Sequence, residues 1–165
     1  MIFGKNNLDL GMLAPIVLNG DNLQYVSEIK YLGTTIIAGK KFSFSAKTDL
    51  ASFYRASNSV INVLVDAHEE ILLQLLYTNC VPIISYACAV KQYSSRDMSS
   101  CNVAINNVIR KIFSFERWES TRSLRQSFGY KSIYEIFEKS RGLFLKSCKT
   151  HPNPIVTFVL SLNLD

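Results

Sequence analysis

The spacing of the apolar residues changes at about Phe42. Before that position, short runs of β-branched and aromatic residues alternate with turn residues, a pattern typical of short strands. After it, apolar residues recur at every third or fourth position, which is the period of a helix that buries one face. The sequence therefore predicts a mainly α (α+β) fold, in which a small N-terminal antiparallel β-meander precedes a helical bundle.

The β-region contains one strong hairpin signal. Asn19-Gly20 follows the apolar run Ile16-Val17-Leu18, and both turn residues tolerate the positive φ that a two-residue hairpin turn requires. We expect the return strand around Leu23, and residues 29–37 are the third strand candidate. Met1-Ile2-Phe3 is a further candidate for a short strand.

Two helices are expected between this region and residue 94. The first begins after Phe42, with Ser43 or Ser45 as its N-cap. The second begins at Asp66, which would form a capping box with Glu69, and runs to about residue 89. Because Pro82 removes a backbone donor and crowds the preceding turn, we expect a kink there.

Three more helices are expected from residue 95 onward. The first spans about Ser95 to Phe113, and a short one near residues 121–128 ends at Gly129. The last begins with a capping box between Ser132 and Glu135 and stops at the His-Pro-Asn-Pro run of residues 151–154. Its expected apolar face consists of Ile133, Ile136, Phe137 and Phe144.

The sequence shows no catalytic or metal-binding constellation. Phosphoryl transfer with two metal ions needs clustered carboxylates, and the acidic group at residues 66–70 is instead typical of a helix start. The sequence lacks G-x-S-x-G, G-x-x-x-x-G-K-[ST] and G-x-G-x-x-G, so neither a hydrolase nor an NTPase is expected. We therefore assign no catalytic residue, metal or cofactor to this chain. The six aspartates are scattered: Asp9, Asp21, Asp49, Asp66, Asp97 and Asp165.

Charge and cysteine content narrow the class of partner and compartment. The formal net charge is +5, and residues 110–149 hold ten Lys and Arg against four acids. Such a local basic excess favours an anionic partner, most often nucleic acid. No apolar run reaches the roughly 18 residues of a membrane span, so no membrane partner is expected. Four widely spaced cysteines and no secretory signal predict free thiols and an intracellular location.

The segment Lys30-Tyr31-Leu32-Gly33 is the candidate for a binding function. An aromatic residue on a short β-turn, with a glycine that permits close backbone approach, can seat a nucleic-acid backbone. The alternative is an ordinary edge strand that contains a buried tyrosine. Composition and spacing leave both interpretations open.

The order of these motifs resembles the C-terminal part of reverse transcriptases from non-LTR (LINE-type, jockey-like) retrotransposons. The resemblance rests on Met1-Ile2-Phe3-Gly4, on residues 17–23 and on Lys30-Tyr31-Leu32-Gly33. It continues with Leu76-Tyr77 and residues 81–87, which are similar to the thumb pattern L-Y-x-x-x-x-P-x-L-x-Y-G. Ala87 stands where that pattern usually has glycine.

The resemblance implies that this chain is a piece of an RNA-directed DNA polymerase, since the aspartates that hold Mg²⁺ in that family belong to a palm domain that would precede Met1. The implied partners are an RNA or RNA–DNA template–primer, bound weakly, and the missing palm domain. Tyr31, Leu32 and Gly33 would form the primer grip, with Lys30 as the adjoining cation. The implied phosphate contacts are Lys40, Lys41, Lys47 and Arg55.

The implied organisation has four parts. Residues 1–41 form the end of the palm with the primer grip, 42–94 the thumb helices, 95–149 the connection helices and 150–165 a tail. The competing hypothesis is a helical structural or interaction module without enzymatic activity. In that case the apolar surface of Ile16, Leu18, Tyr31 and Ile36 would support self-association.

Overall fold

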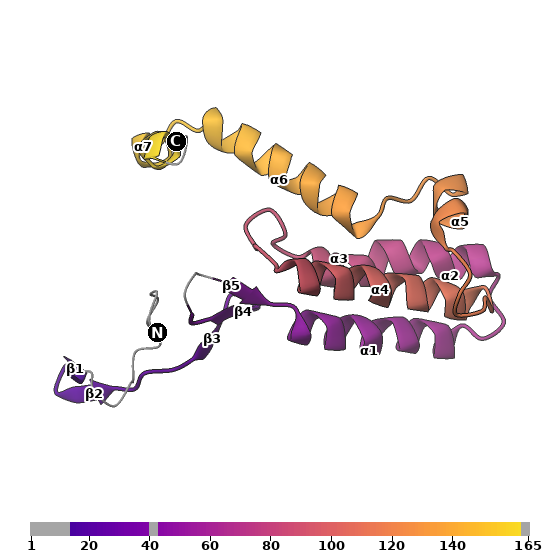
Figure 1. The fold of residues 1–165 in the computed structure, drawn as a ribbon, viewed down its shortest axis with the longest axis horizontal. Helices are drawn as coiled ribbons and strands as arrows, with labels where there is room; N and C mark the ends of the chain where they lie inside the picture. The colour runs from indigo at the N-terminus through magenta and orange to yellow at the C-terminus, as the bar shows by residue number, and fades with distance from the viewer. Residues whose placement is uncertain (1–13, 40–42, 163–165) are drawn as a thin grey trace.

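The computed structural model describes residues 14–39 and 43–162, and most of this chain is helical (Figure 1). The strands lie in the N-terminal part and all the helices follow them, which confirms the predicted mainly α (α+β) fold. The strand candidate Met1-Ile2-Phe3 lies outside the described residues.

The β-region forms two small sheets rather than one meander. The first pairs β1 (Ile16–Leu18) with β2 (Asp21–Leu23), and the connecting residues Asn19 and Gly20 have φ values of 53° and 90°. Positive φ at both central residues defines the twisted two-residue turn that Asn-Gly favours. The predicted hairpin is therefore confirmed.

The strand candidate over residues 29–37 is a hairpin rather than one strand, and its turn falls in the segment of residues 30–33. β3 (Glu28–Tyr31) pairs antiparallel with β4 (Thr34–Ile37), and the chain reverses at Leu32 and Gly33. These two residues have φ values of 44° and 75°, so the turn has the same geometry as the first. The short β-turn expected around Tyr31 and Gly33 therefore joins two strands of one hairpin.

The start of the first helix differs from the prediction. Residues Ser43–Ser45 form β5, which pairs with β4 and completes the three-stranded sheet. α1 (Lys47–Val63) follows with Ala46 at its N-cap. Ser45 still contributes, because its hydroxyl oxygen accepts a hydrogen bond from the Lys47 N–H at 3.3 Å.

The second helical segment contains a π-helical turn next to the proline. It consists of α2 (Glu69–Leu75), η2 (Leu76–Cys80) and α3 (Val81–Ser85). The Val81 N–H donates to Leu76 O, five residues back, so the interruption expected at Pro82 takes the form of a π-helical turn. The predicted start at Asp66 is wrong: His68 is the N-cap, and its Nδ1 accepts from the Glu70 N–H at 3.5 Å.

The remaining helices follow the predictions closely. α4 (Ser95–Ile112) buries its apolar seam, and α5 (Arg122–Ser127) ends just before Gly129, whose φ is 72°. α6 (Ile133–Lys149) begins with the predicted capping box between Ser132 and Glu135. One helix was not predicted, α7 (Pro154–Leu162), because the segment is short and apolar along most of its length, so it shows no alternation of apolar and polar positions.

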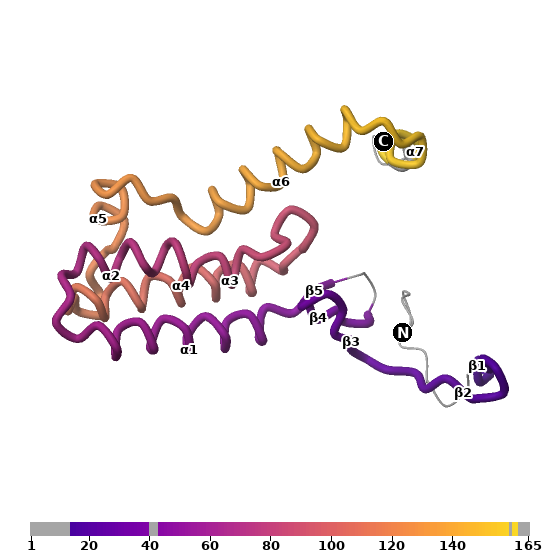
Figure 2. Tube along the Cα trace, turned by 180° about the vertical axis from the view of Figure 1, so that it is seen from behind, coloured from indigo at the N-terminus to yellow at the C-terminus, as the bar shows by residue number. Residues whose placement is uncertain are grey.

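The core lies between α1, the α2–α3 segment, α4 and the first half of α6, and its largest fully buried side chains include Phe53, Leu73, Ile84, Ile109 and Ile133. The second half of α6 and α7 extend away from this bundle, as the view from behind shows (Figure 2). The expectation that Phe144 joins the apolar face is therefore wrong, since Phe144 is 42% exposed. Within the described residues, no helix is long and apolar enough to cross a membrane.

Candidate nucleic-acid interface

The β3–β4 turn presents two large side chains to solvent. Tyr31 is 61% exposed and Leu32 is 72% exposed. The turn itself is held in place, because Thr34 is buried and its hydroxyl donates to Tyr31 O at 2.8 Å. The alternative of a buried tyrosine on an edge strand does not apply to Tyr31.

The back of this turn contacts the end of the α2–α3 segment. Gly33 approaches the ring of Tyr86, and a Cβ at position 33 would lie 3.5 Å from Tyr86 Cε1. Tyr86 is the residue that follows α3. Two of the segments that carry the resemblance, residues 30–33 and residues 81–87, are separated by about fifty residues and lie together in the fold.

A buried polar cluster, formed by Asp49, Lys91 and Tyr93, lies close to this contact. Lys91 Nζ lies 2.7 Å from Asp49 Oδ2, and the Tyr93 hydroxyl donates to the same carboxylate oxygen. Side-chain exposure is 1% for Lys91 and 12% for Asp49. The cluster joins the first turn of α1 to the loop that follows α3.

The same lysine reaches the aromatic residue behind the turn. Lys91 Nζ lies 5.5 Å from the centre of the Tyr86 ring and 5.7 Å from that of Tyr93, within cation–π range. Burial, followed by the hydrogen bond to the Asp49 carboxylate, raises the pKa of Tyr93 above its ordinary value. Tyr93 therefore stays protonated and donates to Asp49 at neutral pH. The buried polar cluster thus fixes the Tyr86 loop on which the β3–β4 turn lies.

Sequence reasoning missed the buried polar cluster, although one signal was present. Asp49 falls between Ala46 and Phe53 on the apolar face of the first helix, where a charged residue needs a partner. Nothing in the sequence indicates that Lys91, forty-two residues later, is that partner. Only the packing of the loop after α3 against α1 brings them together.

The predicted cations are distributed over two elements. Lys30 is exposed in β3, while Lys47 and Arg55 are exposed on α1, about 12 Å apart along the helix axis. Arg55 donates to Ser52 Oγ at 3.1 Å. Lys40 and Lys41 lie outside the described residues. The structure thus brings Lys30, Tyr31, Leu32 and Gly33 into one strand and turn, and places Lys47 and Arg55 along α1.

No cluster of three or more His, Cys, Asp or Glu that could hold a metal ion occurs in residues 14–39 and 43–162. All four cysteines are free, and Cys80, Cys88 and Cys101 are buried. Comparisons of the chain with known protein families, with curated proteins and with solved structures found no match.

Proposed function

We propose that this chain is a nucleic-acid-holding part of an RNA-directed DNA polymerase of the non-LTR retrotransposon type. In this proposal the β3–β4 turn is the primer grip, the helices from α1 to α3 form the thumb and the helices from α4 to α6 form the connection. The partner is an RNA or RNA–DNA template–primer, bound without sequence preference, and the Mg²⁺-dependent chemistry belongs to a palm domain. A nucleic-acid partner and four free thiols favour an intracellular location.

The observation that carries this proposal is the fixed, exposed β3–β4 turn. Tyr31 and Leu32 point into solvent, while Gly33 lies against Tyr86 and the buried polar cluster fixes the loop behind it. A rigid turn with an exposed aromatic residue can hold a nucleic-acid strand at a defined position, because little conformational entropy is lost on binding.

A second local feature supports the same assignment. Ala87 has a φ of 54°, in the left-handed region that favours glycine, and it stands where the thumb pattern has glycine. The backbone at this position therefore has the conformation for which glycine is preferred, although the residue differs.

The test measures binding of a fluorescently labelled RNA–DNA hybrid by anisotropy at increasing salt. We expect weak binding that falls as salt rises, because released counterions drive phosphate contacts. Tyr31→Ala should lower the affinity about tenfold, within the range measured for aromatic contacts to bases. The matched control is Tyr134→Ala on α6, which is also exposed and should bind like the wild type.

Two outcomes would contradict the proposal. One is the absence of binding at low salt, and the other is equal binding by the Tyr31 and Tyr134 variants. We also expect no incorporation of deoxynucleotides by this chain with any template–primer and Mg²⁺, so incorporation above background would refute the assignment of the chemistry to another domain.

One observation favours the second candidate, an interaction module. The β1–β2 hairpin exposes four apolar side chains, Ile16, Val17, Leu18 and Leu23, each by 47% or more. A hairpin of three-residue strands needs a neighbour to be stable in water. In the polymerase proposal that neighbour is the palm, and in the module proposal it is a second copy of the chain.

A further inference from the structure

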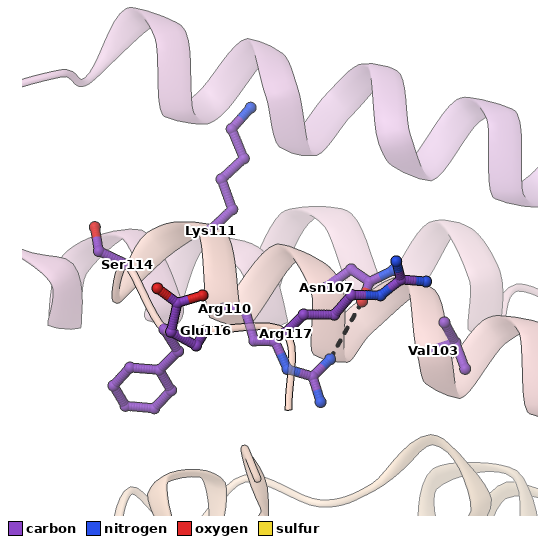
Figure 3. A pocket seen from close by; sticks show the side chains of 8 residues that line it. Val103, Asn107, Arg110, Lys111, Ser114, Glu116 and Arg117 are labelled. Carbon is purple, nitrogen blue, oxygen red and sulfur yellow. Dashed lines mark hydrogen bonds between the residues drawn. The ribbon is translucent and has the colours of Figure 1, made fainter. Parts of the chain in front are cut away.

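An open pocket of about 650 Å³ lies where α4 ends and the next loop begins (Figure 3). Arg110, Lys111 and Arg117 contribute three positive charges to its lining, and Glu116 contributes one negative charge. Figure 3 shows Arg110 and Lys111 extending to different sides of α4, while Arg110 and Arg117 share the pocket with Asn107. The residues that line the pocket therefore have a net charge of +2, and Arg110 and Arg117 carry the positive charges beside Asn107 (Figure 3).

Neutral oxygen atoms hold two of these cations in position. Arg110 donates from Nε to Glu119 O at 3.0 Å and from Nη1 to Asn107 Oδ1 at 3.2 Å. Lys111 Nζ donates to Asn58 Oδ1 on α1 at 3.0 Å. These contacts orient the side chains without neutralising their charge, and they leave three of the five guanidinium N–H donors of Arg110 available.

The basic region has no internal counterions at salt-bridge distance. Among residues 14–39 and 43–162, Lys91 is the only Lys or Arg with a carboxylate within 4.0 Å, that of Asp49. None of the ten Lys and Arg of residues 110–149 therefore has a carboxylate partner. An uncompensated, pre-oriented guanidinium is the group that binds phosphate most effectively, through paired N–H donors.

A turn beside the pocket exposes the only tryptophan of the chain. The Glu119 N–H donates to Glu116 O at 3.1 Å, which places Arg117 and Trp118 at the centre of a four-residue turn. Trp118 is 82% exposed. Basic groups beside an exposed aromatic ring are the combination with which proteins bind single-stranded nucleic acid, by phosphate contacts and base stacking.

We propose that this pocket binds a phosphodiester group of a single-stranded nucleic acid, and that Trp118 stacks on a neighbouring unpaired base. Arg110 and Arg117 donate to the phosphate oxygens. The pocket is distinct from the β3–β4 turn, because the turn lies near the N-terminal end of α1 and the pocket lies toward its other end (Figure 1). A 17-residue helix such as α1 is about 25 Å long, so the two sites are separate.

The fluorescence of Trp118 provides a direct test, since the chain has no other tryptophan. The full chain is titrated with an oligothymidylate of about ten nucleotides, a length typical of single-strand binding sites. We expect saturable quenching that weakens as the salt concentration rises from about 50 to about 200 mM. Inorganic phosphate at matched ionic strength should not reverse the quenching, because it offers no base to stack.

Two variants locate the phosphate contact. Arg117→Gln removes a charge from a side chain in the turn and should weaken binding about tenfold. It should also lower, by about one, the slope of log affinity against log salt concentration. Lys149→Gln, at the C-terminal end of α6, removes the same charge outside the pocket and should change the affinity less than twofold. Thermal unfolding followed by circular dichroism should be the same for both, because no described contact holds either side chain.

A third variant tests stacking independently of charge. Trp118→Ala, measured by anisotropy of a labelled oligothymidylate, should weaken binding about tenfold. The proposal is overturned if Trp118 is not quenched at low salt, if Arg117→Gln and Lys149→Gln weaken binding equally, or if polyglutamate displaces the oligonucleotide as well as unlabelled oligothymidylate does. The primer-grip proposal is tested separately by Tyr31→Ala, which should leave the Trp118 signal unchanged.

Discussion

Lys91 Nζ lies 2.7 Å from the carboxylate of Asp49, and both side chains are nearly inaccessible to water. Burying either charge alone is costly, because the interior replaces only part of its hydration. The pair therefore forms together with the packing of the loop after α3 against α1. This relationship supports the surface that we assign to nucleic acid, since the same loop carries Tyr86.

Removing one partner of this pair should destabilise the fold strongly. We expect Asp49→Ala to lower the free energy of unfolding by about 3 kcal/mol, because it leaves the buried Lys91 charge uncompensated. Urea unfolding measures the change. Asp66→Ala, at an exposed position, is the matched control and should stay within about 0.5 kcal/mol of the wild type.

The double variant Asp49→Leu/Lys91→Met distinguishes a charge effect from a packing effect. It should recover most of the stability lost in Asp49→Ala, since replacing a buried ion pair by apolar groups is often close to neutral. A double variant as unstable as Asp49→Ala would contradict this explanation.

Ala87→Gly should stabilise the protein. Ala87 has a φ of 54°, where a Cβ is unfavourable, and glycine relieves that strain at some cost in the entropy of the unfolded chain. We expect a net gain of about 0.5 kcal/mol, measured by thermal unfolding. Ala89→Gly lies two residues away at a position without positive φ, so it should destabilise instead. A loss of stability in both variants would refute the strain argument.

Stability should decline in alkaline solution. Burial raises the pKa of Cys101 from 9.0 to about 11 and that of Tyr77 from 10.0 to about 12. Because both groups lose their proton more readily in the unfolded chain, their contribution is intact below about pH 9 and is lost as the pH rises toward 12.

Urea unfolding under reducing conditions, repeated at several pH values, follows this decline. Tyr77→Phe should make the decline shallower above pH 10, because phenylalanine keeps the stacked contact with Tyr130 but cannot ionise. A free energy of unfolding that stays constant up to about pH 11 would show that the fold does not raise the pKa values of these two groups.

The exposed β1–β2 hairpin should determine the oligomeric state of the isolated chain. Leu18→Lys should shift any concentration-dependent association toward the monomer, as measured by sedimentation velocity, because it places a charge in the apolar patch. Leu143→Lys on α6 changes a side chain with the same 59% exposure and is the control. If Leu143→Lys shifts the chain to the monomer and Leu18→Lys does not, the self-association surface lies on α6 instead.

Local signals in the sequence were sufficient for much of the helical architecture. Three features were predicted because each depends on residues that are close together in the sequence. They are the seam of α4, the capping box of Ser132 and Glu135, and the Asn19-Gly20 turn. The boundaries that failed have two different causes, one in strand pairing and one in a local cap. Residues 43–45 became a strand because β4 offered hydrogen-bond partners, and the helix after Asp66 starts later because His68 caps it.

The sequence by itself determined that strands precede the helices, the basic excess of residues 110–149 and the short turn that presents Tyr31. The tertiary structure decided which residues support and surround the candidate sites. It placed Tyr86 behind Gly33, joined Asp49 to Lys91, and set Arg110 and Arg117 in one pocket beside an exposed Trp118. The physical reason is that the energy of a buried or unneutralised charge depends on the groups that surround it in space. Which groups these are depends on how helices far apart in the chain pack together.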